Sequence, residues 1–401
     1  MLSSSIIATS LAVAFSLLGD SALYAVLPSQ AENIGLRLSL VGIILSANRF
    51  VRLLTNISSG YIYDYLLRPW LFIVALIVGA ITTSIYGLFW QFWILLIARL
   101  VWGACWSFIR LEGYSIVAKT AMEQQYGKSM GYYKSISGLG FLAGYLLGGI
   151  FVDSFGYRNC FLTLAGITIL GVIIIFCTPL YQRPEEISKT HDSHSKKNAE
   201  ESNVSDDLKL KGNIRNQVAI SYVAFINTLV SSGIVVSTLG LLLKIQFGTS
   251  IDIWRISIGI ASLTGFLLSI RSFMNLILAP VFGHLSDRVG RSTLIFSGLF
   301  SGALSLISLA FFKRPFFLVP AILGNYASTI AISVSSDASI AKLTPQALRG
   351  RFISGYVTWL DFGAALGPIF GYLIGANFSL AWMYLAGLLL FISAIFVYYV
   401  T

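Results

Sequence analysis

The chain alternates long apolar segments with short polar ones along almost its whole length. Each apolar segment is close to the about 20 residues that a helix needs to cross a bilayer core about 30 Å thick. An unpaired backbone amide in lipid is so unfavourable that such a segment must be a helix. The pattern predicts twelve transmembrane helices, over residues 5–29, 38–63, 70–90, 92–118, 130–152, 158–180, 216–243, 254–282, 292–312, 315–340, 351–375 and 378–400.

One polar tract interrupts this pattern and divides the spans into six and six. Residues 183–215 hold 14 of the chain's 44 charged side chains. We therefore expect an all-α, polytopic membrane protein with an N-terminal six-helix bundle at 1–181, a cytoplasmic polar linker at 182–215 and a C-terminal six-helix bundle at 216–401. Two histidines of the linker, His191 and His194, lie in a solvated stretch, so we expect no metal site there.

Composition supports a membrane protein over a soluble one. Hydrophobic residues make up 56% of the chain and charged residues 11%, whereas soluble domains carry about 25% charged residues. The net charge of +10 does not indicate nucleic-acid binding, because the basic residues alternate with apolar runs and do not gather on one wet face. No phosphate-binding loop, nucleophile–base pair or metal-ligand cluster is present, so we expect no enzyme activity and no cofactor.

Loop charges predict the orientation, because Lys and Arg are enriched in cytoplasmic loops. If both termini are cytoplasmic, the inner loops outside the linker hold eight basic residues and the outer loops six. We therefore expect both termini on the cytoplasmic side of the inner membrane.

The two halves match each other at one constant shift of 223 residues. The matching positions are Gly60 and Asp64 with Gly283 and Asp287; Ala118 and Lys119 with Ala341 and Lys342; and Gly140, Gly144 and Gly148 with Gly363, Gly367 and Gly371. Three motifs that share one shift indicate a duplicated six-helix unit. Such repeats place the substrate site between the halves, near the bilayer midplane.

The segment after the eighth span resembles the cytoplasmic gating motif of the major facilitator superfamily, and the pattern is Gly283-x-x-x-Asp287-Arg288-x-Gly290-Arg291. The first-half copy keeps Gly60, Asp64 and Arg68 but has Tyr65 and Leu67 where Arg and Gly are expected. The resemblance implies that each aspartate meets an arginine or a helix N-terminus when the inner side is closed, and that opening breaks this contact.

Two further motifs are similar to those of the proton-coupled drug and metabolite efflux branch. Arg99-x-x-x-Gly103 resembles its fourth-helix arginine motif. The fifth span resembles its glycine-rich antiporter motif, with Tyr145 in place of the usual proline. Glycines four residues apart line one helix face and allow close helix packing; they are Gly140, Gly144, Gly148 and Gly149 in the first half, and Gly363, Gly367 (followed by Pro368) and Gly371 in the second.

Several ionisable or polar residues lie inside predicted spans, where they usually face a cavity or a partner. Asn48, Arg52 and Asn56 recur every four residues and form one polar stripe, and Arg271 and Asn275 have the same spacing. The candidate substrate and proton cavity therefore comprises Asp20, Tyr24, Asn48, Arg49, Arg52, Arg99, Arg110, Glu112, Asn227, Arg271, Asn275 and Asp361.

Asp20 is the strongest candidate for a proton carrier, because it is a carboxylate deep in the first span, with Arg49 as a potential neighbour. Arg52 and Asp361 both fall near mid-membrane. In the family that the chain resembles, spans two and eleven touch, which implies an Arg52–Asp361 contact, with Arg49 as the alternative.

These observations favour a secondary transporter that works by alternating access, exports a small organic molecule and exchanges it for protons. Five arginines against three acids inside the spans leave uptake or exchange of an organic anion or metabolite as an alternative. A non-transporting membrane receptor is the alternative of another class. We expect a monomer in the lipid bilayer whose partners are the substrate and protons, and no nucleic acid.

Overall fold

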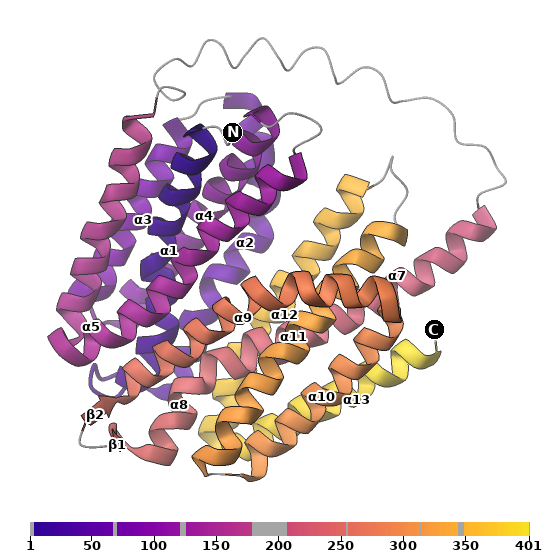
Figure 1. The fold of residues 1–401 in the computed structure, drawn as a ribbon. Helices are drawn as coiled ribbons and strands as arrows, with labels where there is room; N and C mark the ends of the chain where they lie inside the picture. The colour runs from indigo at the N-terminus through magenta and orange to yellow at the C-terminus, as the bar shows by residue number, and fades with distance from the viewer. Residues whose placement is uncertain are drawn as a thin grey trace. The chain divides into compact units, whose positions relative to one another are not determined.

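A computed structural model gives the fold (Figure 1) and describes residues 4–66, 70–120, 126–178, 207–253, 256–312, 314–343 and 349–400. Apart from one short hairpin and a few turns, these residues are helical. The helices are α1 (Ser4–Gln30), α2 (Leu38–Leu66), α3 (Trp70–Leu88), α4 (Phe92–Thr120), α5 (Tyr126–Phe176), α7 (Asp207–Asn227), the π-helix η5 (Thr228–Val235), α8 (Val236–Phe247), α9 (Ile260–Val289), α10 (Arg291–Phe311), α11 (Pro315–Leu343), α12 (Arg349–Asn377) and α13 (Leu380–Val400).

The helical class is confirmed. Within the described ranges, eleven helices are long and apolar enough to cross a membrane. The longest, α5, has 51 residues and contains two helices joined at Gly156, whose φ of 79° and ψ of 168° are not helical. The spans predicted at 130–152 and 158–180 lie on either side of this break.

The start of the eighth predicted span differs from the sequence-based expectation. We expected a helix to begin at 254, but the described residues form the two antiparallel strands of a hairpin, β1 (Ser250–Ile253) and β2 (Ile256–Gly259). The isoleucines at 251, 253, 256 and 258 alternate with other residues at the period of two that favours a strand. The helix α9 therefore begins only at Ile260.

The chain divides into two compact units. One contains Met1–Ser188 and Ser237–Phe273, and the other contains Lys189–Val236 and Met274–Thr401. The first unit thus includes α8, the hairpin and the first part of α9, all of which follow the linker in sequence. Residues 179–206 of the expected linker lie outside the described residues, and α7 already begins at Asp207. The division at 182–215 stays a prediction.

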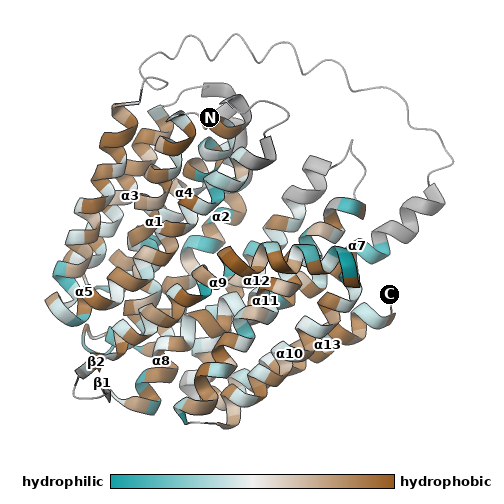
Figure 2. Ribbon diagram, in the orientation of Figure 1, coloured by the Kyte–Doolittle hydropathy of each residue, from teal (hydrophilic) through white to brown (hydrophobic). Residues whose placement is uncertain are grey.

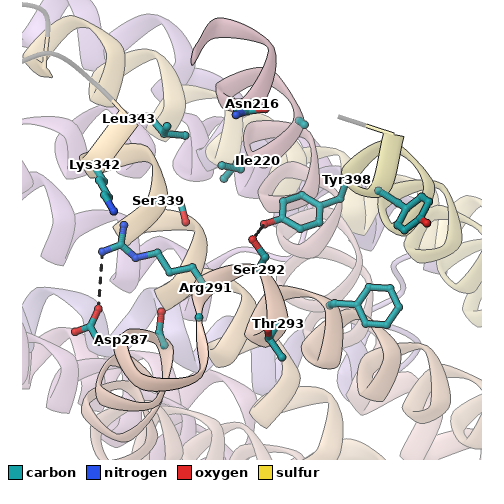
Figure 3. A pocket seen from close by; sticks show the side chains of 15 residues that line it. Asn216, Ile220, Asp287, Arg291, Ser292, Thr293, Ser339, Lys342, Leu343 and Tyr398 are labelled. Carbon is teal, nitrogen blue, oxygen red and sulfur yellow. Dashed lines mark hydrogen bonds and ion pairs between the residues drawn. The ribbon is translucent and has the colours of Figure 1, made fainter. Parts of the chain in front are cut away.

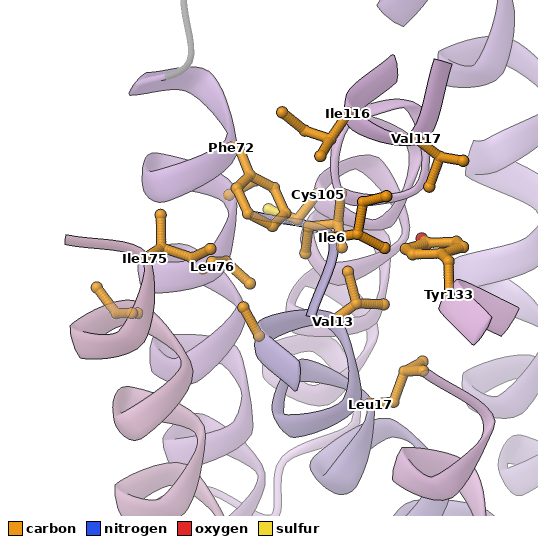
Figure 4. Packing of buried hydrophobic residues seen from close by; sticks show 14 of the residues in the cluster. Ile6, Val13, Leu17, Phe72, Leu76, Cys105, Ile116, Val117, Tyr133 and Ile175 are labelled. Carbon is orange, nitrogen blue, oxygen red and sulfur yellow. The ribbon is translucent and has the colours of Figure 1, made fainter. Parts of the chain in front are cut away.

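In the first unit, α1 is the central helix. It packs along α5, while α2 packs on α4, and α3 packs on α4 and α5. Apolar side chains from α1, α3, α4 and α5 meet in one cluster (Figure 4), which includes Ile6, Leu17, Phe72, Ile116 and Tyr133. Because lipid tails are as apolar as these side chains, the packing depends on close van der Waals contact and polar pairs more than on the hydrophobic effect.

In the second unit, α12 packs on η5, α10 packs on α11 and α13, and α7 contacts α11, α12 and α13. A smaller cluster of Ile220, Ala224, Ile340 and Tyr356 lies among α7, α11 and α12. Large apolar side chains point outward, among them Phe300 at 63% exposed and Leu389 at 67%. Figure 2 shows hydrophobic residues, in brown, along most of the helices. An apolar exterior is what a bilayer requires.

Candidate functional site

A buried ion pair joins the first and fourth spans. Arg99 Nη1 of α4 donates to Asp20 Oδ1 of α1. The Arg99 side chain is completely buried and Asp20 is 8% exposed. Charges at this depth are unfavourable unless they are paired and hydrogen-bonded, so the two side chains require each other.

The second span supplies further partners of this pair. Asn48 Nδ2 donates to Asp20 Oδ1 at 3.0 Å, and Arg99 Nε donates to the Ile44 carbonyl oxygen at 3.2 Å. Arg99 Nη2 reaches the Leu45 carbonyl oxygen at 3.5 Å. One carboxylate and one guanidinium therefore hold α1, α2 and α4 together. The sequence identified the side chains as candidates, but nothing in it pointed to the two backbone carbonyl groups.

Tyr24 connects a second arginine to the pair. Its hydroxyl donates to the Leu45 carbonyl oxygen at 3.0 Å and accepts from Arg49 Nε at 3.3 Å. The Arg99 guanidinium carbon lies 5.5 Å from the centre of the Tyr24 ring, and that of Arg49 lies 5.9 Å from it, within the range of a cation–π contact. Arg49, the neighbour that we expected for Asp20, thus reaches this cluster through Tyr24.

The glycine of the fourth-span motif explains how α2 and α4 come close enough for these bonds. A Cβ on Gly103 would lie 2.8 Å from Asn48 Cα and 2.5 Å from Val51 Cγ1. Any larger residue would therefore push α2 away from α4. In the pattern Arg99-x-x-x-Gly103, the arginine forms the polar contact and the glycine permits the helix approach that the contact needs.

The fifth-span glycines place α1 in the same way. Gly140, Gly144 and Gly148 each face the α1 backbone, and a Cβ on Gly144 would lie 2.6 Å from the Leu18 carbonyl oxygen. Leu18 is two residues from Asp20. The packing stripe that the spacing predicts therefore lies directly along the helix that carries the buried carboxylate.

A neighbouring side of α5 contacts α9. A Cβ on Gly149 would lie 2.9 Å from Ser262 Cα, and Ser269 Oγ donates to the Leu142 carbonyl oxygen at 3.0 Å. Asp153 Oδ2 accepts a hydrogen bond from the Ser262 backbone N–H at 2.7 Å. This carboxylate satisfies an N–H of the first turn of α9, which has no partner inside the helix.

A second polar network links α2 and α4 further along. Ser107 Oγ donates to Asn56 Oδ1 at 2.8 Å and lies 2.8 Å from Thr55 Oγ1. Asn56 belongs to the predicted polar stripe, whereas Ser107 was not singled out. A serine in an apolar span is too common to serve as a signal without its partner.

The other candidate residues lie as follows. Arg52 of α2 and Arg110 of α4 are half-buried, while Glu112 of α4 is 3% exposed. Arg271 of α9 and Asp361 of α12 are half-buried, and Asn275 of α9 is exposed. The expected pairing of Arg52 with Asp361 links residues of different units and stays a prediction.

In the second unit, Asn227 is completely buried at the end of α7. Its Nδ2 donates to the Thr329 carbonyl oxygen at 3.3 Å and to Ser333 Oγ at 3.2 Å, both in α11. The π-helix η5 begins at the next residue. Short π-helical segments frequently occur at functional sites.

The second-half glycines pack α12 on this π-helix. A Cβ on Gly363 would lie 2.7 Å from the Phe225 carbonyl oxygen, and one on Gly367 would lie 2.5 Å from the Leu229 carbonyl oxygen. Gly233 of η5 faces Gly367, and Pro368 and Gly371 are buried nearby in α12. In each half, the glycine stripe therefore packs against the helices with which that half begins. The stripe of α5 packs against α1, and the stripe of α12 packs against α7 and η5.

The motif at the end of α9 and the start of α10 forms local contacts. Arg291 Nη2 lies 3.8 Å from Asp287 Oδ1 in the preceding turn, and Arg291 Nη1 donates to the Ala338 carbonyl oxygen of α11 at 2.9 Å. Gly290 has a φ of 99° and requires glycine, whereas Gly283 has only an ordinary contact, 3.8 Å from Val334 Cγ1. Arg288 is exposed. The first-half positions Gly60, Asp64 and Arg68 lie outside the described side chains.

In the described part of the chain, no group of three or more His, Cys, Asp or Glu residues is placed to hold a metal ion. The buried Asp20 and Arg99 form instead an ion pair with amide and carbonyl partners. The charge of each side chain is balanced by the other, so the contacts of α1, α2 and α4 depend on both.

Comparisons with known proteins identify the family. The model of the Major Facilitator Superfamily matches residues 9–271 and 257–401. The multidrug resistance protein MdtG of Escherichia coli (strain SMS-3-5 / SECEC) is 24% identical over 319 residues, which cover 78% of this chain and 72% of MdtG.

Two solved structures have the same fold. The bacterial homolog of the human lysosomal transporter Spinster, in an inward-facing and occupied conformation, matches with a TM-score of 0.75 and 14% identity over 99% of this chain and 96% of its own. The nucleoside transporter NupG matches with a TM-score of 0.73 and 14% identity over 98% of each chain. With the family model matching nearly its whole length, the chain is a member of the major facilitator superfamily of membrane transporters.

Proposed function

We propose that this transporter exports a small organic molecule from the cytoplasm in exchange for protons, by alternating access of two six-helix bundles. The observation that carries the proposal is the buried Asp20–Arg99 pair with Asn48 as third partner. Protonation of Asp20 removes the charge that holds Arg99. A proton and a substrate that needs either group therefore compete for the same pair.

The order of events follows from this competition. When Asp20 is ionised, it accepts hydrogen bonds from Arg99 and Asn48, and α1, α2 and α4 are tied together. Proton uptake weakens these bonds, and proton release restores them. Coupling arises if substrate binds to one of these two states more tightly than to the other, because a ligand shifts an equilibrium only through differential affinity.

The break at Gly156 supports twelve crossings, because it allows α5 to cross twice. With an even number of crossings, both termini lie on one side, and the loop charges favour the cytoplasm. The likeness to MdtG of Escherichia coli supports efflux and an inner-membrane location. We expect the protein to act as a monomer.

Exchange or uptake of an organic anion is the second candidate. It is favoured by Arg49, which remains partly exposed beside Tyr24 while Arg99 is completely buried with Asp20. A carboxylate substrate could bind to such a guanidinium through two parallel hydrogen bonds. In this case the Arg49 guanidinium, and not the Asp20 carboxylate, selects the substrate.

Proteoliposomes with an imposed pH gradient distinguish the two candidates. Purified protein is reconstituted, and a panel of organic cations and organic anions is tested for transport against its own gradient. Proton-driven movement of cations or neutral amphipathic compounds supports efflux by exchange, and selective movement of anions supports the second candidate.

The Asp20→Asn variant tests the role of the pair. We expect it to lose pH-driven transport, because the amide keeps the shape of the side chain but cannot ionise. Glu32→Gln is the matched control, since Glu32 is 62% exposed and pairs only with Lys244 at 2.7 Å among the described contacts. If Asp20→Asn kept full pH-driven transport, the proton-coupling role of Asp20 would be wrong.

A further inference from the structure

The second unit contains a cavity of about 1000 Å³ at the end where the chain terminates (Figure 3). The first turns of α10, the end of α9 and the last turns of α11 and α13 surround it, together with α7 near Asn216. Part of the lining is apolar and includes Ile220, Phe296 and Leu343. The polar part includes hydroxyl and basic side chains, the Asp287 carboxylate and the Asn216 amide.

Two cations of the polar lining face each other. Figure 3 shows the Lys342 ammonium directed toward the Arg291 guanidinium, although the two residues come from different helices. The carboxylate present is that of Asp287, which lies 3.8 Å from Arg291 Nη2 and is 73% exposed. The basic groups thus exceed the acidic ones, and an anion would relieve their mutual repulsion.

The N-terminus of α10 opens into the same cavity. Gly290 is its N-cap and provides no side-chain hydrogen bond, so the first N–H groups of the helix are not capped. Such groups and the helix dipole favour an anion. The hydroxyl groups of Ser292 and Thr293 lie beside them. Ser292 Oγ accepts a hydrogen bond from Tyr398 at 3.0 Å, so its own hydrogen can still be donated.

A buried serine provides an independent indication of a ligand. Ser286 lines the cavity and is only 2% exposed, yet its hydroxyl has no hydrogen-bond partner among the described residues. Buried polar groups are nearly always hydrogen-bonded, and the exceptions call for an explanation. An acceptor that occupies the cavity would supply the missing partner.

We propose that this cavity binds a phosphate group. The donors come from α9, from the N-terminus of α10 and from α11, so they approach a tetrahedral oxyanion from several directions. The candidate membrane span of α10 begins at Arg291, and that of α13 ends at Val400. The cavity lies at these two span ends, and therefore at the level of lipid headgroups. A phospholipid matches both kinds of lining residue, with its phosphate at the polar ones and its glycerol and acyl carbons at the apolar ones. Free phosphate shares the polar chemistry.

The test measures ligand-induced stabilisation of the full chain. In nanodiscs, phosphatidic acid is titrated into phosphatidylcholine, whose choline group covers its phosphate with a cation. In detergent, inorganic phosphate is titrated against sodium chloride at equal ionic strength. We expect phosphatidic acid to raise the unfolding midpoint in a saturable manner, because a ligand that binds only the folded state stabilises it. If inorganic phosphate produces the same effect, the ligand can also be a soluble phosphate.

Three variants decide whether the effect belongs to this cavity. Ser286→Ala and Lys342→Gln should each weaken the apparent affinity by about tenfold, the order expected for a lost hydrogen bond to a charged group. Ser286→Ala should leave the midpoint without ligand unchanged, because the removed hydroxyl has no partner. Arg288→Gln is the matched control, since it removes a charge from the last turn of α9, near Ser286, but Arg288 does not line the cavity. The proposal is overturned if neither phosphate source stabilises the protein, or if the first two variants lose no more affinity than Arg288→Gln.

Discussion

Gly103 of α4 faces the backbone of Asn48 in α2 so closely that a Cβ on the glycine would lie 2.8 Å from Asn48 Cα. Asn48 in turn donates to Asp20, and Arg99, one helical turn before Gly103, forms an ion pair with the same carboxylate. The polar contacts to Asp20 thus depend on how closely α2 and α4 approach each other at Gly103. This dependence gives the fourth-span motif a physical meaning that can be tested.

Gly103→Ala should destabilise the protein and impair transport together. The added methyl group must push α2 away from α4, which costs about 1–3 kcal/mol in a packed interior and lengthens the Asn48–Asp20 hydrogen bond. Thermal unfolding in detergent and transport in proteoliposomes measure the two effects. Gly138→Ala is the control, because a Cβ there meets nothing within 4 Å. If Gly103→Ala and Gly138→Ala had equal stability and equal transport, the close approach of α2 and α4 would not matter for either property.

Neutralising both members of the Asp20–Arg99 pair should lower the stability by less than the sum of the two single changes. Removing one partner leaves an uncompensated buried charge, with a cost of about 3–5 kcal/mol. The double variant Asp20→Asn with Arg99→Gln removes both charges, so we expect a favourable coupling of about 1–3 kcal/mol.

Unfolding midpoints of the two single variants and the double variant measure this coupling. The double variant should still lack pH-driven transport, which separates stability from function. Strictly additive effects would mean that the two side chains do not depend on each other.

Gly367→Ala should destabilise the second unit as Gly144→Ala destabilises the first. A Cβ on Gly367 would lie 2.5 Å from the Leu229 carbonyl oxygen, and one on Gly144 would lie 2.6 Å from that of Leu18. Each variant should lower the unfolding midpoint, since neither backbone carbonyl can move without its helix. Gly355→Ala, in α12 but with nothing within 4 Å of its Cβ, should be tolerated. A tolerated Gly367→Ala would contradict the packing of α12 on η5.

Gly283 and Gly290, the two glycines of the motif between α9 and α10, should respond differently to substitution by alanine. Gly290 has a φ of 99°, a conformation that costs other residues about 1–3 kcal/mol. Gly283 is helical, and a Cβ there would make only an ordinary contact with Val334 at 3.8 Å. Gly290→Ala should therefore lower the unfolding midpoint, and Gly283→Ala should leave it nearly unchanged. The reverse order would show that Gly283, and not Gly290, limits the stability of this segment.

The periodic features were predictable from the sequence. Apolar segments long enough for a bilayer gave the helical class and most helix positions, since lipid allows no other backbone solution for such a segment. The glycines four residues apart predicted packing faces, because that spacing aligns them on one side of a helix. Asp20, Asn48 and Arg99 were all identifiable as candidates, since polar groups in an apolar span are unfavourable and few.

Other features depend on contacts between distant parts of the chain. The sequence contains five arginines that could have met Asp20, and it pointed first to Arg49. Only the packing of α1, α2 and α4 selects Arg99, because Gly103 allows α4 to approach and the Ile44 and Leu45 carbonyl groups receive the rest of the guanidinium. The pairing of strands 250–253 and 256–259 and the π-helix after Asn227 are not predicted by the sequence pattern either.

By itself, the sequence determined that the chain crosses a membrane many times as helices, and which residue types must lie inside, because these follow from the local free energy of placing each segment in lipid. The tertiary structure decided which charges meet and which glycines face a neighbouring backbone. It also brought Ser286, Arg291 and Lys342 around one cavity. These relationships depend on distances between helices, and helix distances are set by all the side chains at a contact at once and not by any one segment.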